Sequence, residues 1–294
     1  MVKVTSIGHL TLATPDIERQ AEHYKDVVGL GEVGRTADEI YLACPQDACS
    51  IVLRRAATAA CAKLALRVPA DTDLAAVEKD LKDLGITPQA ASDPVPGIAR
   101  ALTFSGPCGL VFEVVNERPQ SAVSVDKGIV PNRLGHVAFV VNDIQEAVRF
   151  LEEGLGFRIS DWMGDFFAFM RCGPDHHTVN FIKGDATRMH HHAFEARDFS
   201  HIKDTCDLLG AKRIPLIWGP GRHGIGHNIF TYHYNPDQQI VEVYTELDQM
   251  SDESKGYFDP RPWHEDNPQR PKVWTPGPFT SNIWGIPTPE KFRQ

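Results

Sequence analysis

Three kinds of sequence feature are missing from this chain, and each absence narrows the class of protein. No apolar stretch is long enough to span a bilayer, and the first residues lack the charged and apolar regions of a secretory signal. No run of lysine and arginine occurs, and the formal net charge is −9. We therefore expect neither a nucleic acid nor a membrane as a partner.

Cysteine is present, but not in a pattern that suggests pairing. The six cysteines contain no C-x-x-C pair, the spacing common to redox and zinc motifs. We interpret them as reduced packing residues and expect a cytoplasmic protein without disulfides. They are Cys44, Cys49, Cys61, Cys108, Cys172 and Cys206.

What the chain does have is an internal repeat. A glycine–histidine pair precedes an apolar run at residues 7–12 and again at residues 134–139, and Gly-Leu-Gly follows in each half at residues 29–31 and 154–156. In three places an aspartate lies seven residues after a histidine: His9 and Asp16, His136 and Asp143, His191 and Asp198. The chain is therefore interpreted as two related halves, each made of two units of strand, helix and further strands.

Local signals agree with this organisation. Asp143 and Asp198 are good N-caps, and apolar residues recur at helical spacing after each of them. Gly210 is placed to end the second of these helices. Short apolar runs at residues 40–43 and 51–53, bounded by turn residues, are typical of strands. An apolar helix face needs a sheet to cover, so we expect helices on the outside of curved sheets.

Three residues in the second half form a candidate metal site. His136, His191 and Glu242 each lie in a strand-like, apolar setting, and ten of the thirteen histidines fall between residues 136 and 233. Two neutral imidazoles and one carboxylate on adjacent strands can occupy one face of an octahedral metal ion and leave the other face open. This is the ligand set of ferrous enzymes that activate oxygen. A buried core histidine explains any one of these residues, but not the three together.

Two points about the ligands stay open. In the triplet at residues 190–192, strand alternation turns His191 inward and its two neighbours outward, whereas a register shift of one residue would make His192 the ligand. The first half keeps His9 and Glu113 at ligand-like positions but has Lys63 near the place of a second histidine. We therefore expect the first half to bind no metal.

The chain is long enough for two cores. With 294 residues and 42% hydrophobic content, two domains are expected. The predicted parts are an N-terminal domain at 1–120, a small and polar linker at 121–130, a metal-binding C-terminal domain at 131–250, and a tail at 251–294 rich in proline and tryptophan. The tail contains Trp263, Trp274 and Trp284. Because burial of tryptophan offsets the cost of ordering, we expect an ordered tail that covers the active site or packs between subunits.

With this repeat and these candidate ligands, the chain resembles the type I extradiol ring-cleaving dioxygenases of the vicinal oxygen chelate superfamily. The family signature is G-x-H, then a hydrophobic residue and Tyr, then D/N-P-x-G, then Glu. It matches Gly221-Arg222-His223, Thr231-Tyr232, Asn235-Pro236-Asp237-Gln238 and Glu242. Thr231 stands where an apolar residue is usual and Gln238 where Gly or Pro is usual, so the local turn is in doubt more than the chemistry. The resemblance implies an α+β fold in which each of two domains pairs two βαβββ modules into curved mixed sheets, with helices outside.

The resemblance also implies roles for further residues. His177 matches the acid–base histidine of the family, while its neighbour His176 is interpreted as a solvated loop residue. His223 and Tyr232 match the residues that hydrogen-bond the catecholic oxygens. Phe169 and Trp218 are expected to form aromatic walls around a flat substrate ring. All of these residues belong to the second half of the chain, as the three candidate metal ligands do.

The function implied by the resemblance is extradiol cleavage of a catechol by O2. The resemblance implies a mononuclear Fe(II) centre, in which Mn(II) could replace iron. It also implies a product of the muconic semialdehyde type and a homo-oligomer. One alternative is another metalloenzyme on the same scaffold, either a glyoxalase-like isomerase or a dioxygenase for hydroquinone or hydroxyquinol. The other is a module that binds aromatic molecules without catalysis.

Overall fold

The computed structural model describes residues 2–117, 123–254, 256, 258 and 270–292. Its strands are β1 (Ser6–Thr14), β2 (Gly31–Arg35), β3 (Glu39–Ala43), β4 (Ile51–Arg55), β5 (Ala60–Arg67), β6 (Gln89–Ser92), β7 (Ile98–Ser105), β8 (Val111–Glu117), β9 (Leu134–Val141), β10 (Arg158–Met163), β11 (Phe167–Arg171), β12 (Val179–Lys183), β13 (Arg188–Glu195), β14 (Leu216–Arg222), β15 (Ile229–Tyr234), β16 (Ile240–Thr245) and β17 (Lys272–Trp274). The α-helices are α1 (Ile17–His23), α2 (Leu74–Asp83), α3 (Ile144–Leu155), α4 (Phe199–Ala211) and α5 (Pro278–Ser281), with a π-helix η1 (Tyr24–Val28) and 3-10 turns η2 (Pro107–Gly109) and η3 (Glu290–Phe292).

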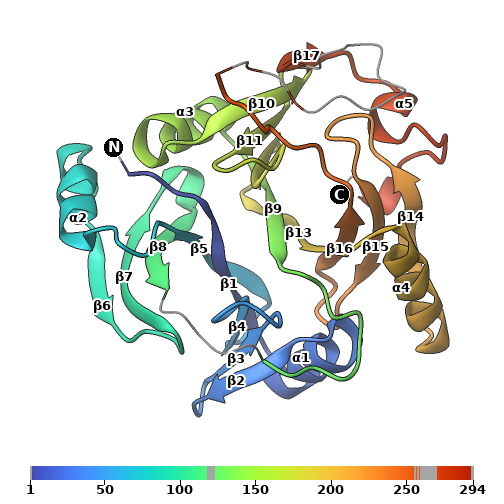
Figure 1. Ribbon diagram of the computed structural model, residues 1–294, viewed down its shortest axis with the longest axis horizontal. Helices are drawn as coiled ribbons and strands as arrows, with labels where there is room; N and C mark the ends of the chain where they lie inside the picture. Colours follow the sequence, from blue (N-terminus) through green and yellow to red (C-terminus); the bar gives the residue numbers. More distant parts are fainter. Residues whose placement is uncertain (1, 118–122, 255, 257, 259–269, 293–294) are drawn as a thin grey trace.

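The strands form two mixed sheets, one from each half of the chain (Figure 1). The first has eight strands in the order β2-β3-β4-β1-β5-β8-β7-β6, and the second has nine in the order β14-β15-β16-β13-β9-β12-β11-β10-β17. In all four units the first strand pairs in parallel with the last strand of the same unit. The two units of each half join through their antiparallel first strands, β1 with β5 and β9 with β13. The predicted pairs of βαβββ modules are confirmed.

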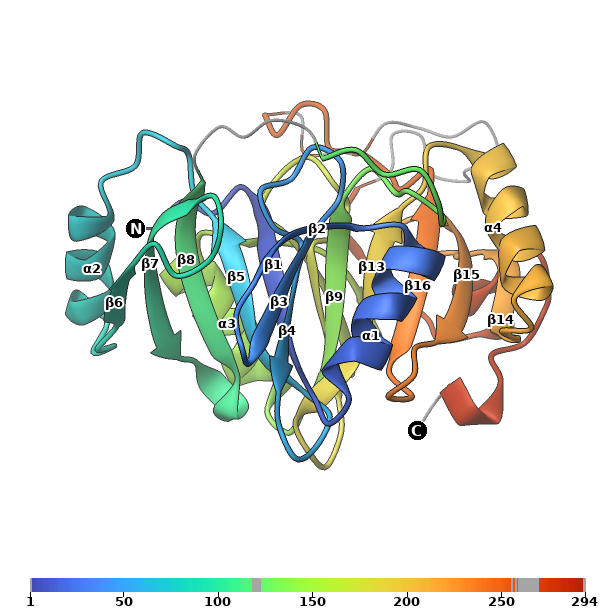
Figure 2. The same ribbon diagram turned by 90° about the horizontal axis from the view of Figure 1, so that it is seen from below.

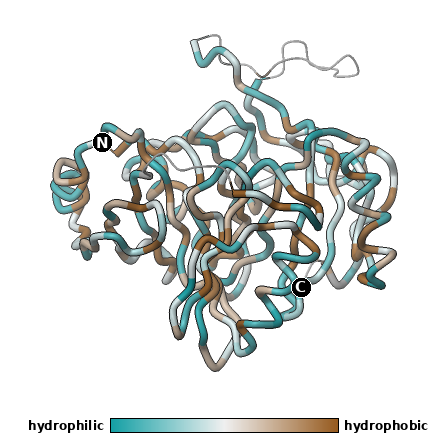
Figure 3. Tube along the Cα trace, turned by 60° about the horizontal axis from the view of Figure 1, so that its bottom comes forward, coloured by the Kyte–Doolittle hydropathy of each residue, from teal (hydrophilic) through white to brown (hydrophobic). Residues whose placement is uncertain are grey.

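The helices lie outside the curved sheets, as Figure 2 shows for α1, α2 and α4. The Asp143 side chain accepts a hydrogen bond from the Glu146 backbone at the start of α3, and Asp198 does the same for His201 in α4. The predicted end of α4 at Gly210 is wrong, because the helix continues to Ala211. Hydrophobic residues concentrate along the inner strands, while hydrophilic residues are frequent in the loops and outer helices (Figure 3).

The two halves share one continuous apolar core. It extends from residues such as Leu10 and Phe112 in the first half to Phe139 and Phe181 in the second, all at most 2% exposed. Side chains of this size contribute roughly 1.5–3 kcal/mol each when fully buried. The core therefore holds the two sheets in a fixed relation.

The C-terminal segment belongs to the second half. Its strand β17 pairs in parallel with β10 and forms the edge of the second sheet, and α5 and η3 follow. Trp274 is half-buried, but Trp284 is 46% exposed, so the expected burial of this tryptophan is wrong. Trp263 lies outside the described residues, as does part of the predicted linker. The domain boundaries stay a prediction.

No helix among the described residues has the length and apolar character needed to cross a membrane.

Candidate metal centre

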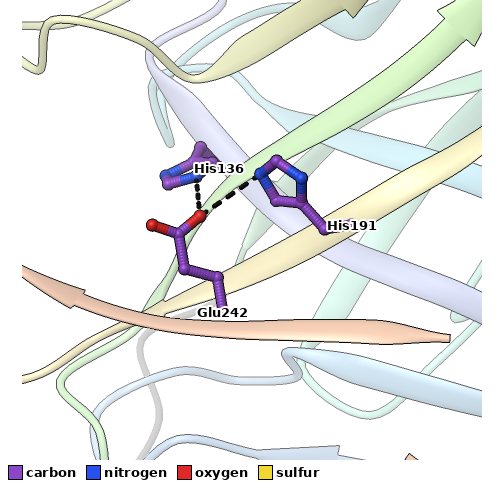
Figure 4. Close-up of side chains that lie close together, drawn as sticks. All are labelled: His136, His191 and Glu242. Atoms are coloured by element: carbon purple, nitrogen blue, oxygen red, sulfur yellow. Dashed lines mark hydrogen bonds and ion pairs between the residues drawn. The ribbon is translucent and has the colours of Figure 1, made fainter. Parts of the chain in front are cut away.

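His136, His191 and Glu242 extend from three neighbouring strands, β9, β13 and β16. Ala193 of β13 pairs with His136 on one side and with Glu242 on the other, and His191 lies two residues before Ala193. Side chains two residues apart on a strand share a face, and so do directly paired residues. The three side chains therefore converge on one point, as Figure 4 shows.

The distances and burial of these side chains suit a metal ion. Glu242 Oε2 lies 2.9 Å from His136 Nε2 and 3.2 Å from His191 Nε2, and each residue is at most 5% exposed. Within the described part of the chain this is the one group of three or more histidine, cysteine, aspartate or glutamate residues that could hold a metal ion, and its ligand atoms lie within 4.8 Å of one another. The buried His191 Nε2 has no hydrogen-bond partner. Two imidazoles and a carboxylate with an orphaned nitrogen fit a divalent transition metal.

Protonation in the site favours metal binding. Burial by itself would raise the pKa of the Glu242 carboxyl, but His136 and His191 hold that pKa well below its usual range. Burial also lowers the pKa of His191, against the attraction of Glu242. An ionised carboxylate and a neutral imidazole are the forms that bind a metal.

His190 determines which nitrogen of His191 carries the proton. His190 Nε2 lies 2.9 Å from the Phe292 carbonyl oxygen, and the Nδ1 atoms of His190 and His191 are 2.7 Å apart. A carbonyl only accepts, so Nε2 of His190 donates and its Nδ1 accepts from His191. The lone pair of His191 is then on Nε2, where a metal ligand needs it.

The predicted position of His190 on the outer face is wrong. A β-bulge between Met189 and His191 breaks the alternation, so His190 lines the same cavity as His191. His192 does point to the opposite face, where its Nε2 lies 2.9 Å from the Tyr24 hydroxyl. The alternative in which His192 replaces His191 is therefore inconsistent with the structure.

A cavity of about 980 Å³ opens in front of the three ligands. Phe169 and Trp218, predicted as aromatic walls, both line it and are 7% and 5% exposed. Phe167 stacks on Phe169 with ring centres 4.2 Å apart, and the C-terminal segment adds Phe292. The cavity is thus mainly apolar, and the three ligands form part of its wall.

The three residues with predicted catalytic roles line this cavity as well. The ring of His177 lies 4.5 Å from that of His136, and burial lowers the pKa of His177 far below its usual value. His223 Nε2 accepts from the Tyr232 hydroxyl at 2.9 Å, because its Nδ1 donates to the Ser281 carbonyl at 2.7 Å. Burial lowers the pKa of His223 to about 4. At neutral pH both histidines are uncharged and able to accept protons.

The hairpin of β15 and β16 explains how Tyr232 reaches the site. In its register Tyr232 pairs directly with Glu242, so the two side chains share a face. Asn235 Oδ1 accepts from the backbone of Asp237 and Gln239 and holds the turn. Gln238, which stands where the family has Gly or Pro, adopts a positive φ of 61°. The departure from the signature therefore costs some backbone strain but leaves the hairpin intact.

Residues that the sequence did not single out complete the site. Asn228 Nδ2 donates to Glu242 Oε1 at 3.0 Å, which orients the carboxylate. The expectation that His176 is a solvated loop residue is wrong: it is 0% exposed and its Nε2 lies 3.0 Å from Asp161 Oδ2. No local sequence signal links His176 to Asp161, which lies 15 residues earlier in the chain.

The glycine before each repeated histidine has a steric cause. A Cβ at Gly135 would overlap the hydroxyl of Tyr244, and one at Gly8 would approach Val115 Cγ2 to 2.9 Å. The strands that carry His9 and His136 therefore need glycine to pack this closely against their neighbours.

The equivalent place in the first half holds a lysine. Lys63 Nζ donates to Glu113 Oε1 at 2.5 Å, and His9 Nε2 lies 3.3 Å from Glu113 Oε2. Burial would raise the pKa of Glu113, but His9 and Lys63 lower it to about 2. An ammonium group has no lone pair for a metal and itself neutralises the carboxylate. This supports the prediction that the first half binds no metal.

Comparison with known proteins agrees with this site. Residues 133–243 match the family model of the Glyoxalase/Bleomycin resistance protein/Dioxygenase superfamily. The manganese-dependent 2,3-dihydroxybiphenyl 1,2-dioxygenase of Geobacillus genomosp. 3 is 26% identical over 92% of this chain and 94% of its own length.

Two solved structures share the fold along the chain. The Mn(II)-bound glyoxalase from Novosphingobium aromaticivorans has a TM-score of 0.86 and 27% identity, and covers 99% of this chain and 94% of its own. The homoprotocatechuate 2,3-dioxygenase from Arthrobacter globiformis has a TM-score of 0.81 and 27% identity, and covers 99% of this chain and 90% of its own.

The second half of the chain therefore contains a domain of the Glyoxalase/Bleomycin resistance protein/Dioxygenase superfamily. Within that superfamily, relatives that match most of the chain's length are extradiol dioxygenases. The resemblance noted from the sequence is confirmed.

Proposed function

We propose that this protein cleaves the ring of a catechol-type aromatic diol with O2, at the bond beside the two hydroxyls, to give a muconic semialdehyde-type product. The observation that carries the proposal is the meeting of His136, His191 and Glu242 with His177, His223 and Tyr232 on one cavity. The first three suit a metal centre, and the other three supply proton acceptors and a donor. Similarity to extradiol dioxygenases along the chain supports the same reaction.

A divalent iron or manganese ion held by the trio would lower the pKa of a bound hydroxyl and bring the diol and O2 together. Three protein ligands on one face of the ion would leave the other coordination positions for the diol and O2. The donor set of two imidazoles and a carboxylate suits either ion, and manganese dependence is recorded in the name of one relative.

The protein's own side chains would handle the protons and the ring. His177, uncharged at neutral pH, accepts a proton from a substrate hydroxyl and returns it later in the reaction. The Tyr232 hydroxyl has one proton, which it donates to His223 Nε2 in the structure, and with the diol bound it would turn that proton to the charge that develops on the substrate oxygens. Phe169 and Trp218 confine a planar ring and exclude water.

A second candidate is a glyoxalase-like isomerisation. It is favoured by the TM-score of 0.86 against the Mn(II)-bound glyoxalase. An isomerase moves protons within its substrate and needs no O2. Dependence on oxygen therefore separates the two functions.

The test is to load the protein anaerobically with Fe(II) or Mn(II) and to add catechol, 3-methylcatechol or 2,3-dihydroxybiphenyl under air. We expect oxygen uptake that matches a yellow ring-opened product, and its loss in His191→Ala. Metal binding without product from any of these diols would overturn the proposal and favour the isomerase.

Tyr232→Phe tests the same proposal at one atom. We expect kcat to fall by about 10²–10³-fold, the cost of losing one preorganised donor, while metal content is unchanged. Tyr234→Phe is the matched control, since Tyr234 follows on β15 but does not line the cavity. Equal kcat values for the two variants would remove Tyr232 from the mechanism.

Compartment and assembly stay predictions. All six cysteines lie in the described part of the chain and none forms a disulfide. Cysteines without disulfides support the predicted cytoplasmic location, where disulfides are rare. The predicted homo-oligomer follows from the family resemblance.

A further inference from the structure

A hydrogen-bonded relay leads from the C-terminal segment to His177. The Lys272 backbone N–H donates to Asp161 Oδ1 at 2.8 Å. Asp161 Oδ2 lies 3.0 Å from His176 Nε2, and His176 Nδ1 lies 3.0 Å from His177 Nδ1. Asp161 and His176 are both 0% exposed and His177 is 3% exposed, so solvent does not compete for these bonds.

The direction of each bond follows from its partners. The carboxylate of Asp161 only accepts, so His176 Nε2 carries a proton. In the tautomer that carries this one ring proton, His176 has its lone pair on Nδ1 and accepts from His177 Nδ1. His177 consequently carries its single proton on Nδ1, and its Nε2 has the lone pair that can take a proton.

We propose that Asp161 and His176 are positioning residues that fix the tautomer of His177, so that Nε2 is its proton-accepting atom. The inference rests on the proposed ring cleavage, in which His177 takes a proton from the diol. It adds two residues that, unlike His177, are not among those that line the cavity. Asp161 precedes His177 by 16 residues and belongs to β10, two strands away from β12 in the sheet order.

The C-terminal segment takes part through its backbone. Asp161 of β10 pairs with Lys272 of β17, so the docking of this strand supplies the N–H that occupies Asp161 Oδ1. With one carboxylate oxygen held by Lys272, the other faces His176. The sheet edge thus orients the first member of the relay.

Asp161→Asn reverses the relay without changing its shape. The Lys272 N–H still requires an oxygen, so the new amide turns its NH₂ group toward His176 Nε2. That nitrogen must then accept, and His176 Nδ1 donates to His177 Nδ1. His177 is left with N–H at Nε2 and cannot accept a proton there. We expect kcat to fall on the order of 10²–10⁴-fold, the range for loss of a positioned acid–base group or of its tautomer.

The experiment compares the full-length wild type with Asp161→Asn and with Asp165→Asn, the same change at an exposed aspartate of the β10–β11 turn. Metal content, KM and kcat are measured on the Mn(II)-loaded proteins. Histidine ring nitrogens are observed by ¹⁵N NMR on the Zn(II)-loaded proteins, since Zn(II) is a d¹⁰ ion without redox chemistry. We expect normal metal content, a kcat loss in Asp161→Asn alone, and a proton that moves from Nδ1 to Nε2 of His177.

A second pair of variants applies if Asp161→Asn fails to fold. His176→Asn keeps an acceptor oxygen near the place of Nδ1 and should preserve the tautomer, whereas His176→Phe offers no acceptor and should lose it. Wild-type His177 protonated at Nε2, or full kcat in Asp161→Asn, would overturn the relay. A wild type that cleaves no diol would instead overturn the proposed function, while the NMR result would still decide the tautomer.

Discussion

His191 and His192 are neighbours in the chain that serve opposite faces of β13. His191 faces Glu242 at 3.2 Å, whereas His192 Nε2 lies 2.9 Å from the Tyr24 hydroxyl of the first half. Both are at most 5% exposed. The same residue type thus belongs to the metal centre in one position and to the contact between halves in the next.

This difference predicts contrasting effects of one substitution. His191→Gln should weaken Mn(II) binding by more than about 100-fold. Loss of a residue that only hydrogen-bonds a metal ligand weakens binding by up to about 100-fold, and loss of the ligand itself should weaken it more. His192→Gln should keep the metal and lower the free energy of unfolding by about 1–3 kcal/mol, since it disturbs a buried hydrogen bond. Calorimetric metal titration and urea unfolding measure the two quantities. Equal metal affinity in the two variants would contradict the assignment of the ligand.

At the scale of elements, residues of the C-terminal segment such as Pro278 and Phe292 form part of the cavity wall. Asn282 is 0% exposed and anchors this segment: its Oδ1 accepts from the backbone of Arg222 and Trp284, and its Nδ2 donates to the Ile286 carbonyl. The anchored segment then presents the Ser281 carbonyl to His223. The segment therefore contributes directly to the geometry of the site.

Asn282→Ala should loosen the segment locally. Groups left without a partner cost about 1–3 kcal/mol, so hydrogen exchange at the Trp284 amide should accelerate about 5- to 150-fold. We also expect KM for the diol to rise, because the wall of the cavity is less ordered. Asn142→Ala at an exposed position is the control. Unchanged exchange in residues 276–292 would show that Asn282 does not anchor the segment.

At the scale of the whole molecule, the two halves interlock through their first helices. The end of α1 and η1 pack on the outer face of the second sheet, where Tyr24 contacts His192 and Phe194. Conversely, Phe150 of α3 in the second half packs against Phe104 and Phe112 of the first half. The first half, with its lysine in place of a second histidine, thereby supports the sheet that carries the metal site.

This contact makes stability depend on pH. Burial, and then the charge of Lys212, lowers the pKa of His23 to about 4, and His23 faces His233 and His192 with Tyr24 beside it. The unfolded chain therefore binds more protons below pH 6.5 than the folded one, so the stability falls as the pH falls from 6.5 toward 4.

The wild type should lose about 2 kcal/mol more stability between pH 7 and pH 5 than His23→Gln, whose side chain does not titrate. Urea unfolding of both proteins, each free of metal, at the two pH values measures the difference. The same pH dependence in the two proteins would exclude His23 as its source.

Much of the fold and of the ligand trio could be predicted from the sequence, because their signals are local. The seven-residue spacing from His136 to Asp143 reflects one strand followed by one helix, and the hairpin signature places Tyr232 before Glu242. The prediction for His190 failed because a bulge changed the alternation of β13, and a bulge depends on the partner strand.

What the sequence by itself determined was the arrangement of modules and the chemical type of the site, since periodicity and spacing carry both. Only the tertiary structure decided that Asp161 meets His176, that Lys63 neutralises Glu113, and that the Ser281 carbonyl reaches His223. These contacts join strands and loops distant in the chain. Their distances depend on how the sheets curve and where the C-terminal segment docks, and no local pattern of residues encodes either.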